Sequence, residues 1–189
     1  MKLSKTKLKI SEAANELFYQ QGFEHTSFSQ IATKVGISRG NFYYHYKTKD
    51  EILTAVITLR LETIRSLIES WEQEHRTPEA RIRAFIRSSL PNKESTKIFG
   101  CPMGSLCSEL NKLVHPAKEE AAEMFSLFRR WLVVQFEALG YHEQADRYSL
   151  HLMTQNQGAA VLASTLGDST IIETQSDAME VWLTELLGR

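Results

Sequence analysis

The sequence predicts an all-α protein, and three observations point to that class. Apolar residues recur at helical spacing along most of the chain, as at Ile10, Ala14 and Phe18. Residues that cap helices precede many of these segments, and Gly or Pro follows several of them. No segment shows the alternation of apolar and polar residues that is typical of a half-buried strand.

The segment over residues 26–53 is the most informative part of the chain. It predicts two short helices joined by a tight turn, followed by the start of a third helix. Ser27 and Gln30 have the spacing of a capping box, which marks the start of the first short helix. Gly36 suits the left-handed position of the turn, and Ser38 can cap the second short helix.

The second short helix is expected to present a polar surface. Two short helices in this arrangement are typical of a helix-turn-helix, in which the second helix enters the major groove of DNA. Phe42 and Tyr46 are expected to face inward, and the outward side chains are Arg39, Asn41, Tyr43 and Tyr44.

Capping and breaking residues divide the rest of the chain into further helices. Thr48 and Glu51 mark the start of a long helix, and Thr77-Pro78 resembles an N-cap followed by proline at the first helical position. The predicted helices cover 48–75, 77 to before Pro91, a stretch opened by Pro102, 115–140, 142–166 and about 170–187, and residues 91–99 are predicted to be a polar loop.

A chain of this length is expected to hold one or two domains, and the helix-turn-helix predicts a DNA-binding domain over residues 1–47 and a helical domain over residues 48–189. The long helix after residue 47 is expected to belong to both. Residues 1–50 contain eight Lys/Arg and four Asp/Glu, whereas the remainder contains 14 basic and 19 acidic residues. A basic first part on an acidic remainder fits a protein whose first part meets phosphates.

Composition and missing motifs argue against other classes of protein. No apolar run reaches the roughly 18 residues of a transmembrane helix, so no membrane partner is expected. No apolar segment follows the N-terminal lysines as in a signal peptide, and two cysteines favour the reducing cytoplasm over a disulfide framework. The familiar motifs of hydrolases, metalloproteases and nucleotide-binding enzymes are absent and the six histidines are scattered, so we expect no enzyme, cofactor or metal.

Residues 22–53 resemble the DNA-binding domain of TetR-type transcriptional regulators. The resemblance implies a homodimer that binds palindromic operator DNA, in most members as a repressor, and a small hydrophobic or electrophilic inducer that releases it. The matching residues are Gly22-Phe23, Thr26, Ile31-Ala32, Gly36-Ile37-Ser38, Gly40, Phe42-Tyr43, His45-Tyr46, Lys49 and Leu53.

The candidate DNA contacts combine residue chemistry with this resemblance. Arg39, in the first turn of the recognition helix, can grip guanine O6 and N7, and Asn41 can pair with adenine or bind phosphate. The resemblance assigns backbone contacts to Tyr43 and His45 and a phosphate contact to Lys49. The full set is Thr26, Ser27, Ser38, Arg39, Gly40, Asn41, Tyr43, Tyr44, His45 and Lys49. A non-specific DNA-binding protein is the alternative, although it would need a more basic chain.

The last two helices are the expected dimer interface. Residues 158–163 followed by Gly167-Asp168 are similar to the penultimate helix of TetR-type regulators, where the last two helices form a four-helix bundle with their copies. Small residues there allow close backbone approach, although the same helices could simply close the core of the monomer. The candidates are Gly158, Ala159, Ala160, Ala163, Met179, Trp182, Leu183 and Leu186.

The candidate sensor residues lie in the middle of the chain. Cys101 precedes Pro102, and a helix N-terminus there would favour a reactive thiolate. Cys107 shares an apolar stripe and is expected to be an inert core thiol. Glycine followed by cysteine at this point is similar to electrophile-sensing and oxidant-sensing members, but ordinary ligand binding remains open. A cavity could be lined by Met103, Leu106, Phe125, Phe128, Trp131 and Met153, unless these residues are simply core.

Overall fold

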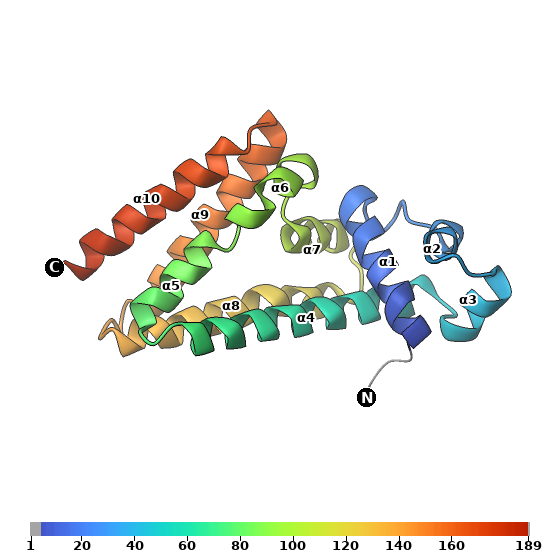
Figure 1. The fold of residues 1–189 in the computed structure, drawn as a ribbon, viewed down its shortest axis with the longest axis horizontal. Helices are drawn as coiled ribbons and strands as arrows, with labels where there is room; N and C mark the ends of the chain where they lie inside the picture. The colour runs from blue at the N-terminus through green and yellow to red at the C-terminus, as the bar shows by residue number, and fades with distance from the viewer. Residues whose placement is uncertain (1–4, 189) are drawn as a thin grey trace. The chain divides into compact units, whose positions relative to one another are not determined.

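The computed structural model describes residues 5–188, and within them it contains helices, turns and bends but no strand. This confirms the all-α class (Figure 1). The helices are α1 (Lys5–Gln21), α2 (Phe28–Val35), α3 (Arg39–His45), α4 (Lys49–Glu74), α5 (Pro78–Arg87), the 3-10 turn η1 (Leu90–Asn92), α6 (Lys93–Phe99), α7 (Pro102–Lys112), α8 (Lys118–Ala138), α9 (Ala145–Leu166) and α10 (Thr170–Leu187).

The chain divides into two compact units whose boundaries differ from the predicted domains. The first unit contains the residues up to Thr63 together with Ser105–Met124, and the second contains Ile64–Gly104 and the residues from Phe125 onward. Helices α4, α7 and α8 therefore each contribute residues to both units. The first unit extends well beyond residue 47, and it includes a segment that is distant in the sequence.

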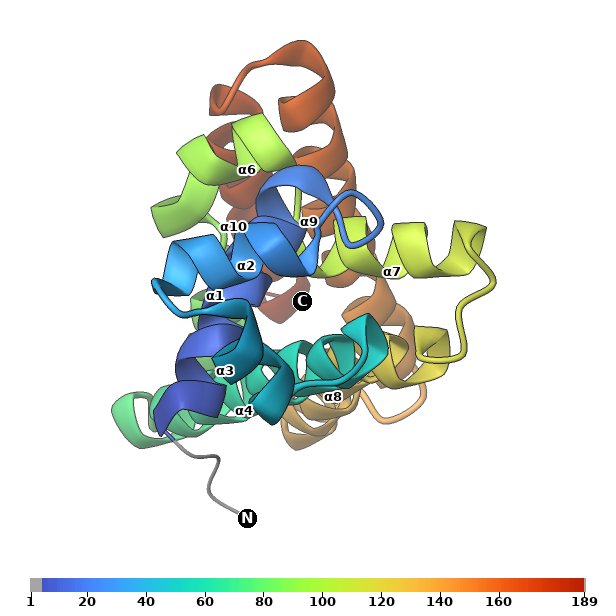
Figure 2. The same cartoon turned by 90° about the vertical axis from the view of Figure 1, so that its right-hand side faces the viewer.

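Helices α1, α2 and α3 lie together in both views of the molecule (Figures 1 and 2). Their apolar faces meet in a small core, as the helical spacing of the sequence predicted. Gly22, with φ of +89°, and Gly36, with φ of +74°, both adopt the left-handed conformation that a side chain would strain. The buried residues are Ile10, Ala14 and Phe18 of α1, Ile31 and Ala32 of α2, Phe42 of α3, and Phe23 and Tyr46.

The capping signals read from the sequence are confirmed at the starts of α4 and α5. Thr77 accepts a hydrogen bond from the amide of Ala80 at 3.2 Å, with Pro78 in the first position of α5. Thr48 Oγ1 accepts a hydrogen bond from the amide of Glu51 at 3.1 Å at the start of α4. Each bond satisfies an amide that has no partner within the helix.

The predicted loop over residues 91–99 is wrong. The chain forms η1 and then α6, which packs against α9 within the second unit and buries Thr96. Charged pairs fix this short helix, since Glu94 bonds both Lys97 and Ser169, and Lys93 pairs with Glu173 of α10. Tertiary contacts of this kind override a weak local preference. The polar composition that suggested a loop instead supplies these partners.

Helix α8 begins later than the predicted start at His115-Pro116. The Nδ1 atom of His115 accepts a hydrogen bond from the amide of Ala117 at 3.1 Å, which stabilises a turn before the helix. Val114 precedes this turn with φ of +51° and is the one described residue other than glycine with a positive φ. Helix α8 ends before Gly140, as predicted, and Gly140 has φ of +92°.

Helices α9 and α10 pack against each other in the second unit. Ala159, Ala163 and Ile172 form a buried cluster between them. Five of the eight predicted dimer residues are therefore core residues of the chain itself: Ala159, Ala160, Ala163, Met179 and Leu183. Gly158 is exposed, Trp182 and Leu186 are half-buried, and the exposed apolar side chains nearby are Val161, Leu162, Leu166 and Val181. No helix within residues 5–188 combines the length and the apolarity needed to span a bilayer.

Candidate nucleic-acid interface

Helix α3 is anchored by its inner face and exposed on its outer face. Ser38 caps the helix, because its hydroxyl oxygen accepts a hydrogen bond from the amide of Asn41 at 3.3 Å. Phe42 is 1% exposed and contacts the ring of Phe28 of α2 at 5.2 Å. Tyr44, by contrast, is 80% exposed. Phe42 thus holds the inner face of the helix against α2, which confirms its predicted inward position.

Tyr46 ties the end of α3 to α1 through a buried hydrogen bond. Its hydroxyl lies 2.8 Å from Oγ of Ser11, and Ser11 donates its own proton to the carbonyl oxygen of Lys7 at 3.0 Å. Since a serine hydroxyl has one proton, Tyr46 must donate to Ser11. Burial raises the pKa of Tyr46, and the negative charge of Glu51 raises it further. The phenol therefore remains a neutral donor at physiological pH.

Arg39 begins α3 on its exposed side. Its Nη2 atom donates to Oγ of Ser29 at 2.7 Å, so α2 orients the guanidinium. This bond uses one of the five N–H donors of the side chain, and the fork that recognises guanine needs two others. Ser29 was not among the predicted site residues, and only the helix-turn-helix geometry could have placed it beside Arg39.

Gly40 follows Arg39 in the first turn of α3. A Cβ atom built at this position has no other atom within 4 Å, so no packing within the chain requires glycine there. Because glycine in a helix costs up to about 1 kcal/mol relative to alanine, its presence at an exposed position needs another reason. Close approach of the α3 backbone to a ligand is one such reason.

The other outward residues of α3 differ in how strongly they are held. Tyr43 packs edge-on against Phe28 at 5.5 Å and remains about half exposed. Tyr44 contacts the ring of His45 at 5.1 Å, and Asn41 is exposed. Arg39, Asn41, Tyr43 and Tyr44 are thus all exposed, whereas His45 is half-buried.

The start of α2 forms the predicted capping box. Ser27 Oγ accepts from the amide of Gln30, and Gln30 Oε1 accepts from the amide of Ser27 at 2.7 Å. Thr26 is only 1% exposed, and its hydroxyl donates to the carbonyl oxygen of Gly22 at 2.7 Å. Thr26 therefore shapes the turn before α2, and any direct contact with phosphate there falls to the exposed Ser27.

Lys49 lies beside the same turn. Its Nζ atom donates to the carbonyl oxygen of Glu24 at 3.0 Å and lies 4.4 Å from the ring centroid of Phe23. The ammonium group has three N–H donors, so this bond is compatible with a phosphate contact through another. The predicted phosphate contact thus also has a structural role.

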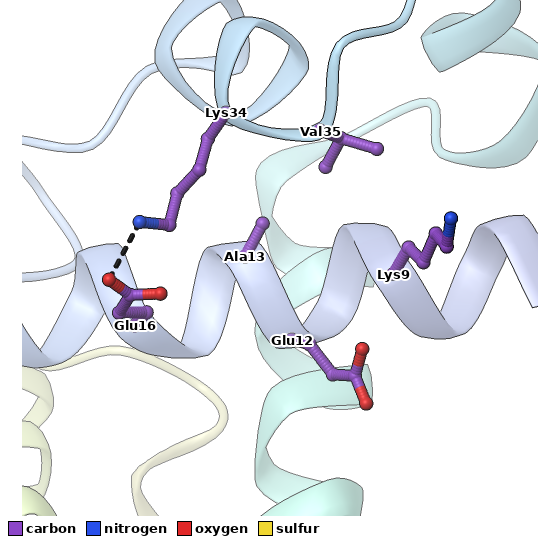
Figure 3. A pocket seen from close by; sticks show the side chains of 6 residues that line it. All are labelled: Lys9, Glu12, Ala13, Glu16, Lys34 and Val35. Carbon is purple, nitrogen blue, oxygen red and sulfur yellow. Dashed lines mark hydrogen bonds and ion pairs between the residues drawn. The ribbon is translucent and has the colours of Figure 1, made fainter.

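A shallow hollow of about 290 Å³ lies between α1 and α2 (Figure 3). It is lined by two carboxylates, Glu12 and Glu16, and two ammonium groups, Lys9 and Lys34. Lys34 and Glu16 form an ion pair at 2.7 Å, which Figure 3 shows at one end of the hollow. Because its charges balance, the hollow offers no net attraction for an anion.

Comparison with known proteins agrees with this geometry. The family described as bacterial regulatory proteins, tetR family, matches residues 10–56, which include α2 and α3. An uncharacterized HTH-type transcriptional regulator of Lactococcus lactis subsp. lactis is 26% identical over 94% of this chain and 93% of its own length. The HTH-type transcriptional regulator LmrA of Bacillus subtilis is 29% identical over 86% of this chain and 88% of its own length.

Residues 10–56 therefore carry the DNA-binding domain of the tetR family. A solved structure agrees in fold: a TetR-family transcriptional regulator from Streptomyces coelicolor superimposes with a TM-score of 0.83, covers 95% of both chains and shares 18% sequence identity. The matched residues contain both α2 and α3, and they lie within the first compact unit.

Cys101 lies just before α7 in the second unit, as predicted. Its Sγ atom accepts hydrogen bonds from the amide of Gly104 and from Nε2 of Gln157, both at 3.5 Å. A Cβ atom at Gly104 would come within 2.7 Å of Oε1 of Gln157, so glycine leaves room for this contact. The sulfur therefore has one backbone and one side-chain N–H donor beside it.

Cys107 is not the fully buried thiol that its apolar stripe predicted. It is half-buried, as Cys101 is, and neither cysteine forms a disulfide. The two cysteines also belong to different compact units, with Cys107 in the first. Exposure alone therefore does not distinguish the two thiols.

Two of the three aromatic residues predicted to line a cavity, Phe128 and Trp131, form a core cluster in the second unit. Trp131 packs against Trp71 at 5.3 Å and donates from Nε1 to Glu72 at 2.9 Å. Phe128 packs against Trp71 at 6.1 Å and Phe85 at 5.5 Å. Leu106 is buried and belongs to the first unit. The half-buried members of the predicted set are Met103, Phe125 and Met153.

Proposed function

We propose that this protein is a tetR-family repressor that binds a palindromic operator as a homodimer and is released by a small hydrophobic or electrophilic inducer. The observation that carries the proposal is the exposed outer surface of α3, where Arg39, Asn41 and Tyr44 project from a helix that Phe42 holds from behind. This is the arrangement in which a recognition helix reads base edges while its flanks contact phosphates.

Arg39 provides the direct test of operator reading. The operator is first selected from random DNA, and the affinity of Arg39→Ala is then measured on it and on a scrambled sequence. The substitution should cost about 1–3 kcal/mol on the operator and relax specificity at one base pair of each half-site. Arg39→Lys is the matched control, because it keeps the charge but loses the planar fork.

The alternative is non-specific DNA binding, and the same experiment separates the two. A non-specific protein would yield no consensus in the selection, and Arg39→Ala would weaken the operator and the scrambled sequence by the same factor. A consensus with two-fold symmetry, read less strictly by both Arg39→Ala and Arg39→Lys, supports the repressor. Since the guanine fork is lost in both variants, their loss of specificity should be similar.

The proposed homodimer uses the last two helices, but with a revised surface. Ala159, Ala160 and Ala163 are buried within the chain, so they support the interface from behind rather than contact a partner. The residues on α9 and α10 that we propose contact the second copy are exposed: Gly158, Val161, Leu162 and Val181. Covering apolar side chains of this size is the usual driving force for association.

The proposed release mechanism has two forms. In the first, an electrophile modifies Cys101, whose sulfur already accepts two N–H donors and is partly exposed. The added group must then displace Gln157 or the start of α7, because the contact at Gly104 leaves little space. In the second form, an apolar inducer binds reversibly beside Met103, Phe125 and Met153.

Alkylation distinguishes these two forms. A mild alkylating agent at neutral pH should release the wild-type protein and Cys107→Ser from operator DNA, whereas Cys101→Ser should stay bound. Mass spectrometry of partly modified protein should find the added group on Cys101 first. If Cys101→Ser is released to the same extent as wild type, the thiol is not the sensor and reversible ligand binding becomes the better explanation.

A further inference from the structure

The turn between α1 and α2, residues 22–27, is held by a side chain that lies far away in the sequence. Glu109 of α7 accepts two backbone hydrogen bonds from this turn, from the amide of Phe23 to Oε2 and from the amide of Glu24 to Oε1, both at 2.8 Å. Hydrogen bonds to a carboxylate are about twice as strong as those between neutral groups. All three residues belong to the first compact unit.

Gly22 makes room for this carboxylate. A Cβ atom at Gly22 would lie 3.0 Å from Oε1 and 3.3 Å from Oε2 of Glu109, so a side chain there would displace the carboxylate or the turn. The φ of Gly22, +89°, is also one that only glycine adopts without strain. Both the backbone conformation and the space in front of it therefore fit the approach of Glu109.

Other contacts make the turn a single rigid piece with the start of α4. Lys49 donates to the carbonyl oxygen of Glu24, next to the amide that Glu109 accepts. The ring of Phe23 contacts both the ammonium group of Lys49, at 4.4 Å, and the ring of His115, at 5.4 Å. The turn thus receives a carboxylate at its amides and an ammonium group at its carbonyl.

We propose that Glu109 is a positioning residue for DNA binding: it fixes the α1–α2 turn and, through it, sets the phosphate contacts made by the N-terminus of α2 and by Lys49. Glu109 lies outside residues 10–56, which carry the family match, so it extends the DNA-binding machinery into α7. The proposal rests on the proposed function, because it concerns how the protein holds operator DNA.

The charge of Glu109 makes the proposal testable, because electrostatic repulsion and positioning predict opposite changes in DNA affinity. A carboxylate close to bound DNA repels phosphates, so replacing it by a neutral residue should by charge alone tighten DNA binding. If Glu109 positions the turn, replacing it should instead weaken DNA binding. Glutamine offers one oxygen and one NH₂ group, so Glu109→Gln can accept from only one of the two amides and turns a donor toward the other.

The experiment compares Glu109→Gln with Glu119→Gln, which removes the same charge from an exposed carboxylate in the first turn of α8, in the same compact unit. Affinity is measured on the selected operator and on scrambled DNA. Glu109→Gln should weaken both by a similar factor, on the order of tenfold, since phosphate contacts carry no sequence information. Glu119→Gln should leave affinity unchanged or slightly tighter.

Amide hydrogen exchange gives a second measurement that does not depend on DNA. In the wild-type protein the amides of Phe23 and Glu24 should be protected, and in Glu109→Gln both should exchange faster while the amide of Gly36, bonded within its own cap, stays protected. Unprotected amides in the wild type, or a Glu109→Gln variant that binds DNA as well as Glu119→Gln does, would overturn the proposal.

The two measurements also separate this proposal from the proposed function. If the protein selects no operator but Phe23 and Glu24 are protected only when Glu109 is present, the repressor proposal fails, and with it the role of the turn in DNA binding, although the contact itself is real. If an operator is selected and Arg39→Ala loses specificity while Glu109→Gln binds normally, only the role of Glu109 fails.

Discussion

Replacing Tyr46 by phenylalanine tests how firmly the recognition helix is attached to α1. The substitution keeps the buried ring and removes only the hydroxyl, which donates to Ser11 at 2.8 Å. Ser11 itself keeps its bond to the carbonyl oxygen of Lys7. No buried donor is therefore left without a partner, and the lost interaction is a single hydrogen bond between neutral groups.

The expected cost follows from this count. One buried hydrogen bond contributes about 1 kcal/mol to the free energy of unfolding. For a chain of this length that corresponds to a decrease of roughly 2–4 °C in the melting temperature. The effect should be accompanied by weaker operator binding, because the end of α3 loses one of its attachments to α1.

The pH dependence adds a second, independent expectation. Burial, with the charge of Glu51, raises the pKa of Tyr46 above its usual value of about 10. A group whose pKa is higher in the folded state contributes stability below pH 10 that is lost as the pH rises through the folded-state pKa. Tyr46→Phe lacks this titration, so the difference in stability between the two proteins should shrink above pH 10.

The assay is thermal or chemical unfolding at pH 8 and at about pH 10.5, above the ordinary tyrosine pKa. Tyr44→Phe is the matched control, because Tyr44 lies on the same helix and is 80% exposed. It should change stability at neither pH. A Tyr46→Phe protein as stable as wild type at pH 8, or a stability difference that stays constant into the alkaline range, would show that the buried hydroxyl does not contribute as argued.

Three further predictions follow from the same structure. Gly40→Ala should stabilise the protein by up to about 1 kcal/mol but weaken DNA binding. A variant that is more stable and also binds DNA more tightly would show that the α3 backbone does not approach DNA closely. Lys49→Ala should weaken binding to all sequences alike and reduce the log–log salt slope by about one per subunit, so an unchanged slope argues against a phosphate contact. Val161→Arg should yield a monomer in light scattering while Val134→Arg, an equally exposed valine on α8, stays dimeric; a dimer in both would place the interface elsewhere.

Local signals predicted the DNA-binding helices well. The capping box at Ser27, the left-handed Gly36 and the cap at Ser38 are each determined by residues within three or four positions, so the sequence contains the whole interaction. The inward position of Phe42 and Tyr46 follows from helical spacing in the same way. These predictions succeeded because their causes are short-range.

The parts that escaped prediction depend on residues far apart in the chain. Helix α6 is held by Glu173 and Ser169, about 75 to 80 positions away, so its own polar sequence was misleading. The bond between Ser29 and Arg39 requires the folded turn. Small residues in α9 predicted close packing correctly, but they left open whether a second copy or the same chain would cover them, and Ile172 of α10 packs there. Spacing alone does not specify which neighbour a helix contacts.

The two-segment composition of the first compact unit matters for engineering chimaeric regulators. A chimaera that takes only residues 10–56, the part that carries the family match, would leave the amides of Phe23 and Glu24 without the carboxylate of Glu109, and the ring of Phe23 without His115. Exchange of DNA specificity between relatives is therefore better achieved by transplanting the outer residues of α3 alone. Where the whole first compact unit is exchanged, residues 105–124 should be transferred together with its N-terminal segment.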